Sequence, residues 1–134
     1  MTHNINHLAI VVPNLDEALH FWRDALGLNL ARTEENPDEK VNIAFVEAGS
    51  SHIELLQPTD PESGIARYME KRGAGMHHVC IEVEDIEATM QRLREHNIEL
   101  INDTPKTRPT DQIRYAFIHP RSTNGVLVEL YELP

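Results

Sequence analysis

The sequence contains one strand-forming segment twice, once near its start and once just past its middle. The two versions are Ile5-Asn6-His7-Leu8-Ala9-Ile10-Val11-Val12 and Met76-His77-His78-Val79-Cys80-Ile81-Glu82-Val83. They begin at positions 5 and 76, which are 71 residues apart. Both are rich in β-branched and other apolar residues, a composition typical of β-strands. An internal repeat of this kind indicates that the chain consists of two copies of one structural unit.

Each of these strands is followed by the pattern of an amphipathic helix. Asn14 and Asp85 suit the N-cap position, and acidic residues follow each of them in the first helical turn. Gly27 and Asn97 suit the opposite ends, where a helix often stops at a residue with positive φ. The i, i+3, i+4, i+7 spacing of a buried helix face is occupied by Leu15, Ala18, Leu19 and Trp22 and by Ile86, Thr89, Met90 and Leu93.

The remainder of each half also matches, so each half is predicted to be a β-α-β-β-β module. Residues 27–30, 44–46 and 52–56 pair with residues 97–100, 116–118 and 127–131. Between the halves, a short helix is expected at about 63–72, closed by Gly73, and a polar loop is expected at 105–111. The predicted fold class is therefore α+β, with residues 1–134 as one domain. It comprises module one at about 1–57, a linker helix segment at about 58–75 and module two at about 76–134. Two such modules can pair their sheets around a metal-containing cleft.

Composition excludes several classes of protein. The 134 residues include 12 Lys and Arg against 22 Asp and Glu, a formal net charge of -10. This balance argues against nucleic acid or an anionic membrane as a partner, because both attract clustered positive charge. Cys80 is the single cysteine, so an intrachain disulfide is impossible, and a buried apolar role is expected for it. With no secretory-signal pattern and no membrane-length apolar run, we expect a cytoplasmic protein.

Four residues stand out as candidate metal ligands. His7 and His78 open equivalent strands, and Glu54 and Glu129 occupy equivalent positions in the last strand of each half. Two imidazoles and two carboxylates suit a divalent ion such as Zn, Ni, Co or Mn, and the sequence does not choose among these metals. Each residue alone would be read as an ordinary polar side chain, but matched positions in the two halves favour a functional role.

The other histidines have no such support from the repeat. His77 could replace His78 through a shift of one residue, but the repeat selects His78. His20 and His96 are expected to be exposed on helices, and His119 to be structural before Pro120. The repeat likewise gives no role to His3 or His52.

Several segments of the chain resemble the vicinal-oxygen-chelate superfamily, which includes glyoxalase I, and within it the methylmalonyl-CoA epimerases. The resemblance covers nearly the whole chain. It is carried by residues 5–10, 53–58, 63–68, 73–79, 117–123 and 125–130. It implies interconversion of the (R) and (S) forms of methylmalonyl-CoA at C2 with a divalent metal ion, and a homodimer, which is common in the family. An acyl-CoA is then the small-molecule partner, with neither nucleic acid nor membrane involved.

The resemblance also implies residue roles. His7, His78 and Glu129 match the family's metal ligands, and Glu54 occupies the fourth ligand position, which is Gln in some members. Glu129 is carried over as one catalytic base. Some members have a second base, a Glu, where this chain has Ile43, so we expect Glu54 to act as the opposing base.

Two further sets of candidates accompany this assignment. Glu47 is a weaker substitute for the second base, because it stands at the predicted end of its strand. The candidates for binding the coenzyme A phosphates are Lys106, Arg108, Arg114 and Arg121. For each of these four cations, a solvated surface position is the competing interpretation.

Two alternative functions stay open at the level of sequence. A glyoxalase I, or lactoylglutathione lyase, shares the His/Glu/His/Glu pattern, and residues 32–37 would suit it as well, whereas residues 119–122 favour the epimerase. A non-catalytic ligand-binding module of the same fold would need no metal, so the matched histidines and glutamates argue against it.

Overall fold

The computed structural model describes residues 3–134, which form two units. The first unit is residues 7–77, and the second is residues 78–134 together with the start of the chain up to Asn6. The first strand therefore begins in one unit and continues into the other. The α+β class predicted from the sequence is confirmed.

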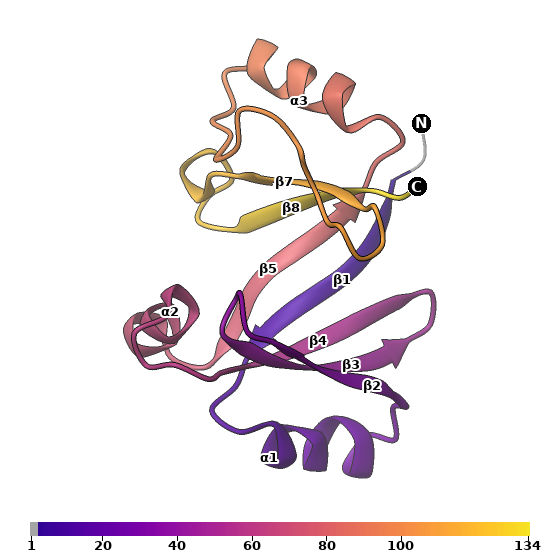
Figure 1. The fold of residues 1–134 in the computed structure, drawn as a ribbon, viewed down its shortest axis with the longest axis vertical. Coiled ribbons are helices and arrows are strands. Elements are labelled where there is room, and N and C mark those ends of the chain that lie inside the picture. The colour runs from indigo at the N-terminus through magenta and orange to yellow at the C-terminus, as the bar shows by residue number, and fades with distance from the viewer. Residues whose placement is uncertain (1–2) are drawn as a thin grey trace. The chain divides into compact units, whose positions relative to one another are not determined.

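The first unit contains a four-stranded sheet in the order β2-β3-β4-β1 (Figure 1). Its strands are β1 (Asn4–Val11), β2 (Leu30–Asn36), β3 (Val41–Ala48) and β4 (Ser51–Pro58). β1 runs parallel to β4, and the other neighbours are antiparallel. The parallel pair needs a long crossover connection, which the helix after β1 and the strands β2 and β3 supply.

A helical segment covers one face of this sheet (Figure 1). α1 (Leu15–Leu19) begins after Asn14, whose side chain accepts a hydrogen bond from the Glu17 amide, as the predicted cap requires. The segment continues as a π-helix, η1 (His20–Ala25), and the chain then turns at Gly27, whose φ is 88°. The expected single α-helix therefore changes its hydrogen-bonding pattern midway. The core beneath it consists of Val12, Leu19, Ala44, Val46 and Leu55 with partly buried neighbours that include Leu15, Ala18 and Trp22.

The second unit contains a sheet in the order β5-β8-β7-β6. Its strands are β5 (Gly75–Glu82), β6 (Lys106–Thr107), β7 (Arg114–Ile118) and β8 (Leu127–Glu132), with β5 and β8 parallel. α3 (Ile86–Glu95) covers one face, capped by Asp85 as predicted and followed by Asn97 at a φ of 61° (Figure 1). The buried residues between α3 and the sheet are Val83, Ile86, Met90, Ala116, Ile118 and Leu130.

The second unit departs from the predicted β-α-β-β-β pattern at one strand. The strand expected at 97–100 is reduced to a single bridge between Leu100 and Ile118, and a two-residue strand, β6, lies in the predicted polar loop. The backbone N–H of Phe117 donates to the Asn102 side chain at 2.7 Å, where a neighbouring strand would supply a carbonyl. The side chain thus replaces one bond of the sheet ladder.

The linker forms the expected helix, α2 (Gly64–Arg72). The buried Ser63 hydroxyl accepts from the Ala66 amide, and Gly73 ends the helix at a φ of 80°. Within residues 3–134, no helix is both long enough and apolar enough to cross a membrane.

Candidate active site

The sheet of the first unit has a second face, opposite the one that α1 covers. Side chains alternate along a strand, so His7 and Ala9 of β1 lie on this second face, while Ile10 packs toward α1. The register then defines rows across the sheet. His7 lies beside His52, and the next row is Ala9, Glu54, Phe45 and Arg32 on four successive strands.

Three polar side chains on this face lie close together. The Glu54 carboxylate oxygen Oε2 is 3.2 Å from His7 Nδ1 and 3.1 Å from His52 Nε2. The two imidazole rings stack with their centroids 5.2 Å apart. His7 is 1% exposed, and the Glu54 side chain is 12% exposed. A carboxylate held in this way is largely withdrawn from water, which strengthens its interactions with any bound cation.

An apolar surface adjoins these three residues on the same face. It consists of Ala9, Val41, Ile43, Phe45 and Leu56, with Ile65 of α2 packed against it. The Arg32 guanidinium lies 3.9 Å from the centre of the Phe45 ring. The face thus presents an apolar floor with a carboxylate and two imidazoles in one part and an exposed cation on the edge strand β2.

The second unit carries a matching pair on the face away from α3. His78 Nε2 lies 3.2 Å from Glu129 Oε1, and the two residues are 9% and 7% exposed. The His78 and Phe117 rings are perpendicular to each other, with centroids 6.0 Å apart. β5 and β8 are parallel neighbours, which is why a residue near the start of β5 can reach one in the middle of β8.

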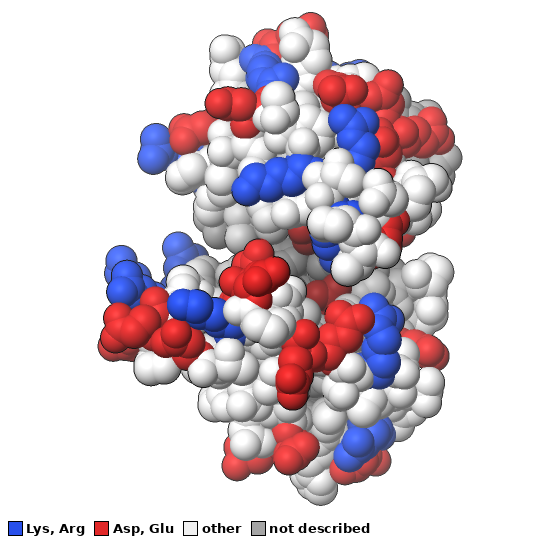
Figure 2. All heavy atoms as spheres, in the orientation of Figure 1, with Lys and Arg blue, Asp and Glu red and all other residues white. Residues whose placement is uncertain are grey.

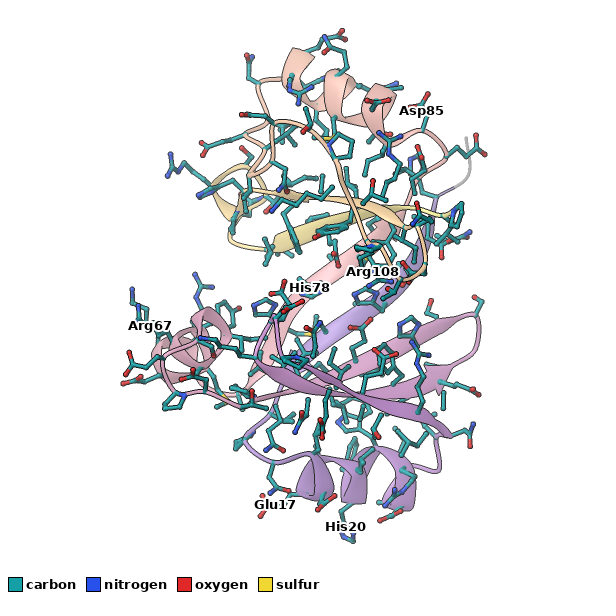
Figure 3. The ribbon with its side chains drawn as sticks, in the orientation of Figure 1. Glu17, His20, Arg67, His78, Asp85 and Arg108 are labelled. Atoms are coloured by element: carbon teal, nitrogen blue, oxygen red, sulfur yellow. The ribbon has the colours of Figure 1, made fainter. Side chains whose placement is uncertain are left out.

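Arg108 lies on the same side of this sheet as His78, away from α3 (Figure 3). It donates to the Tyr131 hydroxyl at 2.9 Å and to the two carboxylate oxygens of Asp111 at 3.1 and 2.5 Å. Partial burial disfavours the charged guanidinium, but Asp111, Tyr131 and Glu129 together outweigh this effect and raise the pKa of Arg108. The same hydrogen bonds lower the pKa of Asp111.

The other predicted substrate-binding cations lie elsewhere on the second unit. Arg114 is 3.3 Å from Glu132 and 3.4 Å from Glu87, and Arg121 is 3.3 Å from Glu99. Lys106 is exposed on β6. Figure 2 shows basic and acidic side chains interspersed over the visible face. Each of these arginines therefore has a carboxylate that competes with an anionic ligand.

The donor set fits a divalent metal ion. His7, His52 and Glu54 place one ligand atom each within 4.8 Å of one another, and all are imidazole nitrogen or carboxylate oxygen. His78 and Glu129 offer a further nitrogen and oxygen of the same kind. Such mixed nitrogen and oxygen donors suit zinc and the neighbouring transition metals.

Sequence reasoning assigned no role in the site to two residues of this face, His52 and Arg32. The repeat aligns His52 with Leu127, so symmetry gave it no support, although its spacing of two from Glu54 puts both on one face of β4. Arg32 was found only through the pairing of β2 with β3. The remaining histidines agree with expectation, since His20 is 83% exposed and His119 Nδ1 accepts from the Arg121 amide.

The sequence matches the Glyoxalase/Bleomycin resistance protein/Dioxygenase superfamily over residues 6–117. The chain belongs to this superfamily. The homologues and solved structures that it resembles include proteins named methylmalonyl-CoA epimerase.

Three of these relatives cover most of the chain. The mitochondrial methylmalonyl-CoA epimerase of Mus musculus is 39% identical over 94% of this chain and 71% of its own. The ethylmalonyl-CoA/methylmalonyl-CoA epimerase of Cereibacter sphaeroides is 37% identical over 99% of this chain and all of its own. A solved methylmalonyl-CoA epimerase in complex with methylmalonyl-CoA and NH4+ is 28% identical, with a TM-score of 0.86 over 99% of this chain and 96% of its own. A lactoylglutathione lyase of Haemophilus influenzae is 36% identical over 67% of this chain and 65% of its own, and a probable lactoylglutathione lyase of Synechocystis sp. is 30% identical over 94% of this chain and 92% of its own.

Proposed function

We propose that this protein is a metal-dependent epimerase of methylmalonyl-CoA, acting by removal and return of the proton at C2. The observation that carries the proposal is the pair of His–Glu contacts at 3.2 Å, one in each unit, at positions that the sequence repeat makes equivalent. Full-length relatives named for this activity support it.

His7, His78, Glu129 and Glu54 would hold the metal. A divalent ion bound there would supply a Lewis acid for the thioester carbonyl and would offset the two carboxylates where an anionic substrate must bind. The ion's identity among Co, Zn, Ni and Mn is left to measurement.

The proton chemistry is assigned to the two glutamates. The C2 proton lies between a thioester carbonyl and a carboxylate, and epimerisation requires that it leave from one face and return to the other. We assign Glu54 to one face of the substrate and Glu129 to the other. Both carboxylates are largely buried, which favours short, well-oriented contacts with a bound substrate.

Ile43 takes no part in proton transfer. It lies on the same face of the sheet as Glu54, within the apolar surface formed with Ala9, Phe45 and Leu56. This surface is proposed to exclude water from the reacting carbon. Glu47, the weaker candidate for the second base, pairs with His52 across β3 and β4 but is exposed.

The cations for the anionic substrate are proposed to include Arg32 besides Lys106, Arg108, Arg114 and Arg121. The Arg32 guanidinium lies over the Phe45 ring, where the substrate's carboxylate would meet it. Its Nε also donates to Glu34 at 2.9 Å, so the substrate would compete with that carboxylate. Arg32→Ala is expected to raise KM several-fold with little change in kcat, as measured by initial rates over a range of substrate concentrations. Equal KM values for the variant and wild type would remove Arg32 from the site.

A glyoxalase I activity is the second candidate. Glu54 favours it, because the resemblance places Gln at this position in some epimerases whereas glyoxalase I shares the His/Glu/His/Glu pattern. It would isomerise the hemithioacetal of glutathione and a 2-oxoaldehyde by the same proton-transfer logic. The third candidate, a non-catalytic ligand-binding module, has no need of a metal.

One paired assay separates these functions. The metal-loaded protein is offered methylmalonyl-CoA in heavy water and, separately, the glutathione–methylglyoxal hemithioacetal. Deuterium incorporation at C2 with no lyase activity is the expected result, and lyase activity alone would overturn the proposal. Metal analysis and chelator treatment accompany the assay. A protein that holds no divalent metal, and whose behaviour does not change with a chelator, would be neither the epimerase nor a glyoxalase I.

The assembly proposed is a cytoplasmic homodimer that binds neither nucleic acid nor membrane. The family's usual state and the acidic composition support it. Light scattering of the purified protein is expected to give twice the chain mass of 15.3 kDa.

A further inference from the structure

We propose that His52 is a positioning residue for Glu54: its Nε2–H holds one carboxylate oxygen and so directs the other toward the metal and the substrate. The inference rests on the proposed function, because Glu54 is a ligand and base only there. It assigns a role to a side chain that the sequence repeat does not support, since the equivalent residue is Leu127.

Two imidazoles meet a single oxygen of Glu54. Oε2 lies 3.1 Å from His52 Nε2 and 3.2 Å from His7 Nδ1. A carboxylate oxygen has two lone pairs, so Glu54 can accept a hydrogen bond from His52 and still face an ion. Carboxylates that bind metal are commonly hydrogen-bonded in turn by residues outside the coordination shell, which fixes their orientation. His52 is assigned that role, whereas His7 Nδ1 faces the same carboxylate and is assigned to the ion.

His52 is itself held on two sides. Its ring stacks on His7 at 5.2 Å and packs against Phe45 at 5.8 Å. Phe45 is in turn covered by the Arg32 guanidinium. The His52 backbone is paired on both sides, with His7 on β1 and with Glu47 on β3. The imidazole is therefore oriented by packing before any ligand binds.

His52 holds Glu54 from the same strand, β4, that carries Glu54. His52 and Glu54 are two residues apart on one strand, so they share a face, and their side chains meet without any adjustment elsewhere. With His52 present, its ring holds the Glu54 carboxylate from the same strand. Without it, that hydrogen bond is lost and the carboxylate regains rotational freedom, which weakens both metal binding and the placement of the base.

The competing role for His52 is direct ligation, because its ring also lies close enough to His7 and Glu54 to complete a three-residue metal group. Direct ligation and positioning differ in one measurable respect. A lost ligand changes the coordination of the ion, whereas a lost positioning residue changes the affinity and leaves the coordination as it was.

The test uses Co²⁺, whose visible absorption reports its coordination, with three variants of the full chain. His52→Leu removes the donor, and His52→Gln replaces it with an amide Nε2 that reaches a similar point. His20→Ala is the matched control, since His20 is 83% exposed on η1. Co²⁺ affinity is measured by competition with a chelator, the absorption bands are recorded at saturation, and thermal unfolding of each metal-free variant is compared with wild type.

We expect His52→Leu to weaken Co²⁺ binding about 10–100-fold with the band positions unchanged. His52→Gln is expected to recover most of that loss, which a merely structural role would not predict, and His20→Ala is expected to bind as wild type does. If His52→Leu fails to fold, the test rests on His52→Gln alone. Shifted absorption bands in His52→Gln, or a Co²⁺ affinity far below that of wild type, then overturn the proposal.

Other outcomes separate the two proposals. Unchanged affinity in His52→Leu overturns the role of His52 and leaves the proposed function intact. Bands that shift in both His52 variants make His52 a ligand and overturn the positioning role. A wild-type protein that binds no Co²⁺ removes the proposed function and the inference together. A His52-dependent Co²⁺ site without epimerisation removes the function alone.

Discussion

Replacing Glu54 by Gln tests the proposed mechanism most directly. Gln has nearly the same shape and keeps an oxygen that can accept a hydrogen bond from His7 or His52, but it cannot take up a proton at neutral pH. The fold should therefore survive, with a loss of stability of about 1 kcal/mol as one charge-assisted hydrogen bond becomes neutral.

The effect on activity follows from the role assigned to each glutamate. A general base contributes roughly 10²–10⁴-fold, so loss of the Glu54 carboxylate should slow epimerisation by that factor, or about 2.7–5.4 kcal/mol in barrier. Glu129 remains, so one epimer should still exchange its C2 proton with solvent while keeping its configuration. The other epimer should lose exchange.

The assay follows each epimer separately in heavy water. Deuterium at C2 is read by mass and NMR, and configuration is read by a stereospecific coupled reaction. Glu47→Gln is the matched control, because Glu47 is an exposed carboxylate opposite His52 on the neighbouring strand, and it should leave both readouts unchanged. Full exchange of both epimers and full epimerisation by Glu54→Gln would refute the role of Glu54 as a base.

Three further predictions follow from the surroundings of the site and from the core. Ile43→Glu should destabilise the fold by roughly 2–5 kcal/mol, because it buries a carboxylate among apolar side chains. In the Glu54→Gln background, the same substitution should restore part of the epimerisation activity. If it restores none, position 43 lies away from the reacting carbon. Met90→Ala should lower the free energy of unfolding by about 2–5 kcal/mol, or Tm by roughly 6–20 °C by calorimetry, because Met90 is 1% exposed on the buried face of α3. A loss below about 1 kcal/mol would contradict that packing. Arg108 lowers the pKa of Asp111 from its ordinary 3.8, so this carboxylate stabilises the fold above pH 3.8 and the contribution is lost as the pH falls through the lowered value. In Asp111→Asn, the free energy of unfolding measured with denaturant should therefore depend less on pH below pH 4. The difference from wild type should be at most about 1 kcal/mol, because solvent screens the pair, and an unchanged pH profile would count against the ion pair.

The local elements could be predicted because neighbouring residues encode them. Asn14 and Asp85 cap their helices by contacts three residues along the chain, and Gly73 ends α2 through its own backbone conformation. The strand missing near Leu100 was not predictable in the same way. Its loss depends on the Asn102 side chain bonding to Phe117, a contact that exists only once β7 is in place.

The sequence by itself determined the repeat, the α+β class and the four candidate ligands, because β-periodicity and matched positions can be read along the chain. It predicted that a histidine and a glutamate of each half would act together, and each of these pairs lies at 3.2 Å. Their roles as ligands and bases are predictions that the variants above test.

Only the tertiary structure decided what surrounds those pairs. The register of β2, β3 and β4 brings Arg32 onto Phe45 and Phe45 beside Glu54, and no local pattern specifies which residues of three strands face one another. The same applies to the carboxylates that partner Arg114 and Arg121. Pairing across a sheet is settled by the burial and hydrogen bonding of all its strands together, so side chains distant in sequence become neighbours only when the sheet forms.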